Sequence, residues 1–338
     1  MKKRIASLDV LRALAVIQVI GYHLALPVFG PLGSLGVDLF FALSGFFISG
    51  ILFTDFEQHG TIRLGRFWMN RAFKILPPLY VFLLAMLLVV PKQKTWEGVV
   101  HSALFSMNYL PVNGPVLHTW SLSLEEQFYA FLPLLLVLLI RLLKKPMDSI
   151  PWVFLVIVIV TFVLRIPNTD GAPFHLRADG LFVGVFIRYL SSYRPRVFQV
   201  VAKFSLVPGL LVWVPGIMLP FYSGLAHSAL FVCIDIGCGC LVAWCYAYET
   251  FPFWNWVPIR ILAAIGVCSY STYLWQQPIV TIFRFGLGGS PLMLLAGFIL
   301  CLVAGWIMYR LVEVPSMRAR KWVQSRLETP APVEAEAH

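Results

Sequence analysis

The stretch SLDVLRALAVIQVIGYH, residues 7–23, decides the fold class of this 338-residue chain. Most of it is apolar, and its length approaches the roughly 20 residues that cross a bilayer as a helix. It nevertheless carries Asp9, Arg12 and His23, three ionisable groups that hydrocarbon penalises. In a helix, Arg12 and His23 fall within about 20° of one face and roughly 16 Å apart, with Asp9 one turn before Arg12. This stripe predicts a polar cavity inside a helix bundle.

The composition of the whole chain indicates the same class. Hydrophobic residues make up 59% and charged residues only 12%, about half of the roughly 25% charge that is usual in soluble domains. The net charge is +10, but Lys and Arg cluster between apolar runs, as in cytoplasmic loops. We therefore expect a lipid bilayer, and no nucleic acid, as partner. The six cysteines lie in apolar runs, which indicates buried residues and no metal site.

Apolar runs that approach the length of a membrane span recur along the chain. They are residues 8–28, 33–54, 74–91, 124–143, 150–166, 177–190, 204–222, 227–248, 260–282 and 291–312. Lys and Arg are concentrated in every second connecting loop, as the positive-inside rule requires for loops on the cytoplasmic side. The expected fold is all-α, a polytopic transmembrane helix bundle of about ten spans with both termini cytoplasmic. Residues 1–323 form the transmembrane domain, and 324–338 are expected to be a disordered polar tail.

Two further segments place charged groups beside apolar runs. Asp38, in GVDLFFALSGFFIS, lies at a depth similar to that of His23. A carboxylate bonded to one imidazole nitrogen would leave the other as a base, whereas the alternative is a helix-starting Asp at the interface. Arg71 and Lys74 lie one turn apart at the cytoplasmic mouth of the third span. Such a pair suits phosphate groups, and an ordinary positive flank is the alternative.

The stretch HTWSLSLEEQFY opens the fourth span. Ser123 and Glu126 fit a capping box, which leaves Glu125 free to face the outer mouth of the bundle. Trp120 and Tyr129 belong either to an interfacial aromatic belt or to a platform that stacks on a sugar.

Together these segments resemble the acyltransferase 3 family of integral-membrane O-acyltransferases, over about residues 7–316. Arg12 and His23 match its Arg-x10-His signature, and WSLSLEEQFY is similar to its WSLSxEEQFY segment. Arg71-Ala-Phe-Lys74 resembles its Arg-x-x-Arg motif, although Lys lacks the bidentate fork of Arg.

Three weaker similarities extend the resemblance toward the C-terminus. RADGLFVG resembles an R-x-D-x-L-x-x-G element, and its Arg177 and Asp179 are two residues apart, so they are not expected to pair directly. Residues 266–279 resemble a stretch that often ends Tyr-Leu-x-His-x-Pro, but Gln276 replaces the His and cannot exchange protons at neutral pH. LVEVPSMR, residues 311–318, is similar to the closing E-x-P element.

The resemblance implies transfer of an acyl group, acetyl first of all, from cytoplasmic acyl-CoA to a hydroxyl of a cell-surface or lipid-linked glycan. It implies a multi-pass protein of the bacterial inner membrane with no permanently bound cofactor. Acetyl-CoA is the expected co-substrate, with its phosphates on Arg12, Arg71 and Lys74. The expected catalytic residues are His23, Asp38 and Glu125. The expected acceptor-binding residues are Trp120, Glu126, Tyr129, Arg177, Asp179 and Gln276.

Several alternatives stay open from the residues alone. His23 acts as a general base or is itself acylated in a ping-pong route. An ion-coupled transporter or flippase also carries intramembrane Asp, Arg and His, but carriers often show internal repeats and paired broken helices, and the sequence shows neither. A non-catalytic scaffold does not explain the Arg12–His23 stripe, although an interfacial Asp9–Arg12 pair would explain part of it. Asp235 has no predicted partner. Surface positions are expected for His101, His118, His175 and His227.

No second soluble domain is recognisable in the sequence. We therefore expect that any unit that completes acceptor handling is a separate chain.

Overall fold

The computed structural model describes residues 4–27, 29, 35–90, 92–168, 172–218 and 221–328, and these form helices and connecting turns without a strand. This confirms the all-α class. The α-helices of the described residues are α1 (Ala6–His23), α2 (Leu35–His59), α3 (Leu64–Val89), α4 (Lys92–Ala103), α5 (Trp120–Leu142), α6 (Ile150–Arg165), α7 (Ala178–Tyr193), α8 (Pro195–Leu210), α9 (Trp213–Met218), α10 (Gly224–Ala247), α11 (Val257–Val267), α12 (Ser269–Thr281), α13 (Pro291–Met308) and α14 (Val314–Glu328).

Among the described helices, seven are long and apolar enough to cross a membrane, and the number rises to eight if the bent pair α11–α12 counts as one span. The chain is therefore a multi-pass membrane protein by helix length and composition. Helices α1 and α7, two of the ten expected spans, are not among the seven. The exact number of crossings and the side of the termini stay predictions.

The two helices that miss this test lie at the centre of the bundle. In α1, 12 of 18 residues are buried, and in α7, 11 of 16. By contrast, the span that contains α6 and the span that contains α13 are mostly exposed. In each, only 17% of the most apolar window is buried. Because other helices shield α1 and α7 from lipid, these two can carry charged side chains that a lipid-facing helix could not.

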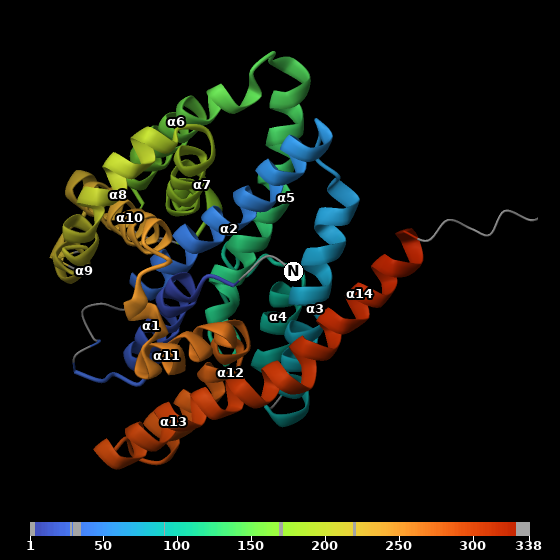
Figure 1. The fold of residues 1–338 in the computed structure, drawn as a ribbon. Coiled ribbons are helices and arrows are strands. Elements are labelled where there is room, and N and C mark those ends of the chain that lie inside the picture. Colours follow the sequence, from blue (N-terminus) through green and yellow to red (C-terminus); the bar gives the residue numbers. More distant parts are fainter. Residues whose placement is uncertain are drawn as a thin grey trace, which may run out of the picture.

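Helix α2 runs through the middle of the molecule, with α7, α8 and α10 on one side and α3, α5 and α14 on the other (Figure 1). The backbones of α2 and α7 are in direct contact at two glycines that leave no room for a side chain. A Cβ on Gly45 would lie 1.8 Å from Leu181 O, and one on Gly184 would lie 2.0 Å from Ala42 O. Small residues let membrane helices approach in this way.

The ninth expected span, 260–282, is broken. Helices α11 and α12 meet at Cys268 with a bend of 74°. The expected span therefore consists of two helices, and this is the one bent pair among the described helices. The break starts α12 at Ser269, inside the bundle rather than at its surface.

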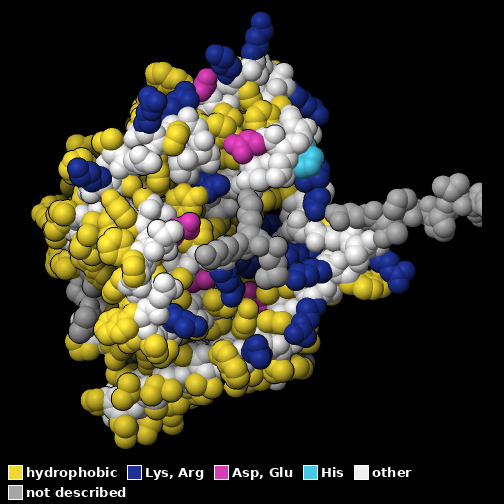
Figure 2. All heavy atoms as spheres, viewed as in Figure 1, with side chains coloured by type: hydrophobic (Ala, Val, Ile, Leu, Met, Phe, Trp, Pro, Cys, Tyr) yellow, Lys and Arg dark blue, Asp and Glu magenta, His cyan; other side chains and the backbone are white. Residues whose placement is uncertain are grey.

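Two outer features complete the fold. Helix α14 continues to Glu328, so residues 324–328 of the expected disordered tail are helical, and 329–338 lie outside the described residues. On the face shown in Figure 2, Lys and Arg side chains gather around the centre, where Figure 1 marks the N-terminus, while hydrophobic side chains cover the left and lower parts.

Candidate functional site

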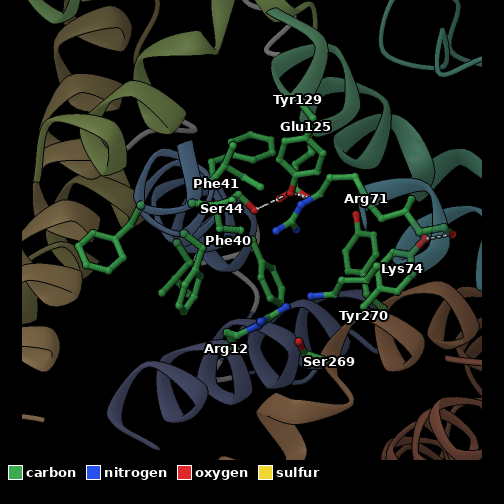
Figure 3. Close-up of a pocket in the computed structure, with 18 of the residues that line it drawn as sticks. Arg12, Phe40, Phe41, Ser44, Arg71, Lys74, Glu125, Tyr129, Ser269 and Tyr270 are labelled. Atoms are coloured by element: carbon green, nitrogen blue, oxygen red, sulfur yellow. Dashed lines mark hydrogen bonds between the residues drawn. The ribbon is translucent and has the colours of Figure 1, made fainter. Parts of the chain in front are cut away.

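A cavity of about 590 Å³ lies at the centre of the bundle. Helices α1, α2, α3, α5, α7, α10 and α12 all contribute to its walls (Figure 3). Its α1 residues come only from the first half of that helix, ending at Arg12, whereas α2 lines it from Val37 to Ile51. Asp9 and Arg12 of the predicted stripe therefore line a cavity with charged walls, as predicted, but His23, its third member, does not.

The three predicted phosphate ligands, Arg12, Arg71 and Lys74, all line this cavity. They converge on it from α1 and α3 in Figure 3. In the part of the chain that the structure describes, none of the three makes an ion pair within 4.0 Å. Arg12 instead lies 5.9 Å from the Phe47 ring centroid, and Arg71 lies 5.6 Å from that of Tyr129. The cavity thus holds cationic groups that form no direct ion pair, although Asp9, Glu126 and Glu313 interact with them electrostatically at longer range.

Basic side chains outnumber acidic ones in the cavity lining. Arg4 and Arg188 add to the three predicted cations, against Asp9 and Glu125. Asp9 pairs with Arg4, at 3.9 Å between Oδ2 and Nε, rather than with Arg12. The lining is therefore net positive and suits an anionic ligand.

Glu125 is partly buried beside α2 in a small hydrogen-bond network. Ser44 Oγ donates to Glu125 Oε1 at 2.8 Å, and Tyr129 Oη donates to Glu125 Oε2 at 3.1 Å (Figure 3). The expectation that Glu125 faces an outer mouth was wrong, because it lines the central cavity. Tyr129 is buried beside it, so it does not form an exposed aromatic belt.

The capping box predicted at the start of the fourth span does not form. Helix α5 begins at Trp120, directly after a 3-10 turn, and Ser123 Oγ donates back to Thr119 O at 3.1 Å. Because the helix starts one turn early, Glu126 lies in its interior, where Oε1 is buried without a hydrogen-bond partner among the described residues. Trp120 packs edge-on against Phe41, with 6.3 Å between ring centroids.

His23 pairs with Gln276 rather than with Asp38. The distance from His23 Nδ1 to Gln276 Oε1 is 3.2 Å, and Gln276 is fully buried. The predicted hydrogen bond between Asp38 and His23 was wrong, because Asp38 forms a buried ion pair with Arg177. The Gln at this position can therefore orient the imidazole without exchanging a proton.

His23 lies just beyond the end of the cavity and does not line it. Gly36 of α2 lies directly against Val19 of α1, and the neighbouring Val37 lines the cavity. His23 follows Val19 by four residues, about 6 Å along a helix. The α2 wall of the cavity therefore begins near the level of Ala15 and Val19, one to two turns before His23, whereas its α1 lining ends at Arg12.

Tyr273 of α12 links the cavity to the His23 region. Its side chain lines the cavity, and its Oη donates to His118 O at 2.7 Å. Gln276 follows one turn later on the same helix. His118 is 3% exposed, so its predicted surface position was wrong.

The remaining predicted ligands, Arg177 and Asp179, lie in a separate group of charges between α2, α6, α7 and α10. We call this group the buried ion cluster: Asp38, Arg165, Arg177, Asp179 and Asp235. Arg165 pairs with Asp179 at 2.6 Å, and Arg177 pairs with Asp38. As predicted, Arg177 and Asp179 do not pair with each other. Asp235 interacts electrostatically with both, so the intramembrane acid without a predicted partner lies in this cluster.

His227 of α10 is another histidine that the sequence analysis expected at the surface. It is 8% exposed, so that expectation was wrong. Its Nδ1 is buried without a hydrogen-bond partner among the described residues.

Sequence reasoning missed several cavity residues. They are Arg4, Ser121, Arg188, Tyr246, Ser269, Tyr270 and Tyr273. Ser269 and the two tyrosines that follow it belong to the SYSTY stretch, which resembles the family but holds no charged group to attract attention. Arg188 reads as an ordinary inner-loop cation, because it stands near the end of its apolar run.

Comparison with known proteins finds relatives that cover most of this chain. A peptidoglycan O-acetyltransferase, OatA, of Listeria monocytogenes is 28% identical over 83% of this chain and 50% of its own length. The O-acetyltransferase OatA of Staphylococcus aureus is 26% identical over 91% of this chain and 56% of its own length. The chain thus spans little more than half the length of these relatives. No solved structure matches it significantly.

The family model of the acyltransferase domain, Acyl_transf_3, matches residues 5–310, nearly the whole described chain. The matched range includes all the cavity residues except Arg4, the His23–Gln276 pair and the buried ion cluster. The enzyme class that this supports is acyltransferase. The chain belongs to the acyltransferase 3 family, as its sequence motifs indicated.

Proposed function

We propose that the chain transfers an acetyl group from acetyl-CoA to a hydroxyl of a bacterial cell-envelope glycan, with His23 as the general base. One observation carries this proposal: a central cavity is lined by basic side chains and also by Tyr273, which lies one turn before the Gln276 that contacts His23. The family membership supplies the reaction class. The names of the relatives, O-acetyltransferases, supply the acetyl group, and one of those names supplies a glycan acceptor.

The charge of the cavity supports a CoA thioester as donor. CoA carries a pyrophosphate and a ribose phosphate at one end and the thioester at the other. Arg12, Arg71 and Lys74 are free to hold phosphate oxygens, because they make no ion pairs among the described residues. Ser269, at the N-terminus of α12, also lines the cavity and adds a buried hydroxyl that has no hydrogen-bond partner among the described residues. We place this end of the cavity at the cytoplasm, where the positive-inside rule puts the N-terminus.

The contact between His23 and Gln276 supports the general-base role. An amide oxygen only accepts hydrogen bonds, so Nδ1 of His23 carries the proton in this arrangement and Nε2 keeps its lone pair. Nε2 takes the proton of the acceptor hydroxyl as its oxygen attacks the thioester carbonyl. The C–S bond breaks, the acetyl ester forms, and the imidazolium returns the proton to the CoA thiolate.

A transfer assay with inverted membrane vesicles tests this function. Vesicles that contain the protein receive radiolabelled acetyl-CoA, and label in the envelope glycan is measured. We expect His23→Ala to lower transfer by at least about 100-fold. His59→Ala, which removes an exposed histidine outside the cavity, serves as the matched control. Wild-type protein that labels no glycan, or His23→Ala protein that labels it equally well, would refute the proposal.

The two chemical routes give different products in the absence of an acceptor. A ping-pong route leaves one labelled acetyl group on the protein, at His23. Direct transfer leaves none, and we expect this result because Gln276 holds His23 as a base.

One observation favours a carrier as the second candidate function. Broken helices such as α11–α12 form substrate sites in transporters. The same vesicles separate the two functions, because a carrier moves labelled acetyl-CoA across the bilayer without forming a new ester.

A further inference from the structure

Arg188 of α7 is a cavity residue that the reaction described above does not use. Its side chain enters the cavity from the α7–α10 wall, which lies across α2 from the α3 wall of Arg71 and Lys74 (Figure 1). The cavity therefore has basic groups on two opposed walls. A ligand with a single phosphate group would need only one of them.

The surroundings of Arg188 hold its guanidinium in one place. Nη1 donates to Tyr246 Oη at 3.1 Å, and the guanidinium carbon lies 5.4 Å from the Phe46 ring centroid and 5.6 Å from that of Tyr246. Gly50 makes the room, because a Cβ there would lie 2.9 Å from Arg188 Nε. Two aromatic rings and a glycine thus keep this guanidinium against the cavity wall.

Arg188 also lacks an anionic partner. It makes no ion pair among the described residues, and its Nε is a buried donor without an acceptor. A buried unpaired donor in a native protein calls for an explanation, and a phosphate oxygen in the cavity would provide one.

The point at which Arg188 contacts α2 indicates which phosphate of the donor it binds. Gly36 lies beside Val19 toward the His23 end, Ser44 bonds Glu125, and Gly50 lies against Arg188. From Ser44 to Gly50 the helix advances about 9 Å, and from Gly36 to Gly50 about 21 Å. Arg188 is therefore well removed from the reacting end and faces the part of the donor that is farthest from the thioester.

On this basis, and resting on acetyl-CoA as the donor proposed above, we propose that Arg188 binds the ribose 3′-phosphate of CoA. Arg71, Lys74 and Arg12, on the other walls, hold the pyrophosphate. Arg188 thereby lets the protein select CoA thioesters over thioesters of 3′-dephospho-CoA.

The test compares two donors, acetyl-CoA and 3′-dephospho-acetyl-CoA, with purified full-length protein and an acceptor glycan. We expect kcat/KM of the wild type to favour acetyl-CoA by roughly tenfold or more, which is the range of a charge-assisted hydrogen bond. Arg188→Gln should reduce the preference to within about twofold by lowering only the acetyl-CoA value. Gly50→Ala, which keeps the charge but displaces the guanidinium, should reduce it in part.

Arg194→Gln is the matched control, because Arg194 ends the same helix, pairs with Asp148 and does not line the cavity. It should keep the full preference. If Arg188 binds a lipid phosphate instead, Arg188→Gln should lower kcat/KM equally with both donors. That result would overturn the inference and leave the proposed function intact. A wild type that uses neither donor would overturn the proposed function and this inference together.

Discussion

Two groups of basic side chains inside the bundle differ in their partners. In the buried ion cluster, Arg165 and Arg177 each face an aspartate. In the cavity, Arg12 and Arg71 face aromatic rings and open space. Charges that are neutralised within the protein stabilise a particular packing, whereas charges without partners can bind a ligand. The contacts of Arg177 and Asp179 thus fit a structural role better than the acceptor binding expected from sequence.

The largest effect expected from this comparison is on stability. Asp38→Ala leaves Arg177 as a buried charge without its partner, so the free energy of unfolding should fall by about 3–5 kcal/mol. Denaturant unfolding in detergent measures it. The double variant Asp38→Leu with Arg177→Met removes both charges and should recover most of the loss.

An exposed ion pair elsewhere in the fold provides the control for this prediction. Asp148→Ala removes the partner of Arg194, and because both side chains are about half exposed, it should cost about 1 kcal/mol or less. If Asp38→Ala left stability unchanged but abolished transfer, Asp38 would belong to the catalytic machinery, and the contrast between the two groups would break down.

The cavity cations should show the opposite behaviour, with a large effect on donor binding and little on stability. Arg71→Met or Lys74→Met removes a side chain that donates hydrogen bonds to phosphate, and it leaves no carboxylate without an ion-pair partner. We expect KM for acetyl-CoA to rise by roughly ten- to a hundredfold with kcat nearly unchanged. Steady-state kinetics with varied acetyl-CoA checks this, and Arg141→Met, exposed on α5, is the control.

Lys74→Arg sharpens the same prediction, because it restores the bidentate fork of the family motif. It should lower KM for acetyl-CoA rather than raise it. Unchanged KM in all three variants would place the donor elsewhere.

A smaller effect is expected at the other end of the cavity. Gln276→Leu removes the acceptor that orients His23 Nδ1, so kcat should fall by about tenfold while KM for acetyl-CoA stays the same. Gln276→His restores the residue of the family pattern and should retain activity. A larger change in KM than in kcat would show that Gln276 contacts the donor instead.

The smallest effect is expected at Glu125. Tyr129→Phe removes one of its two hydrogen bonds and leaves that from Ser44, so stability should fall by about 1 kcal/mol. Thermal unfolding of Tyr129→Phe and Ser44→Ala should show similar losses. A drop in kcat of a hundredfold for either variant would instead give Glu125 a direct part in the reaction.

The sequence alone determined the class of the fold and the chemistry of half the site. Apolar runs predict helices, because a lipid-exposed backbone must satisfy its own hydrogen bonds. The spacing of Asp9 and Arg12 predicts their common face, since helical periodicity is local. Arg12, Arg71 and Lys74 could be grouped because the positive-inside rule predicts that all three lie at the same side of the bundle.

Tertiary structure alone decided which charges pair and where the cavity lies. Asp38 and Arg177 are 139 residues apart, and His23 and Gln276 are 253 apart. No local periodicity encodes such contacts, because they depend on how α2, α7 and α12 cross and on the break at Cys268. Arg188 could not be assigned to the site from the sequence for the same reason. Its place in the sequence is that of a cation that flanks a span, and only the approach of Gly50 and Tyr246 makes it part of a binding site.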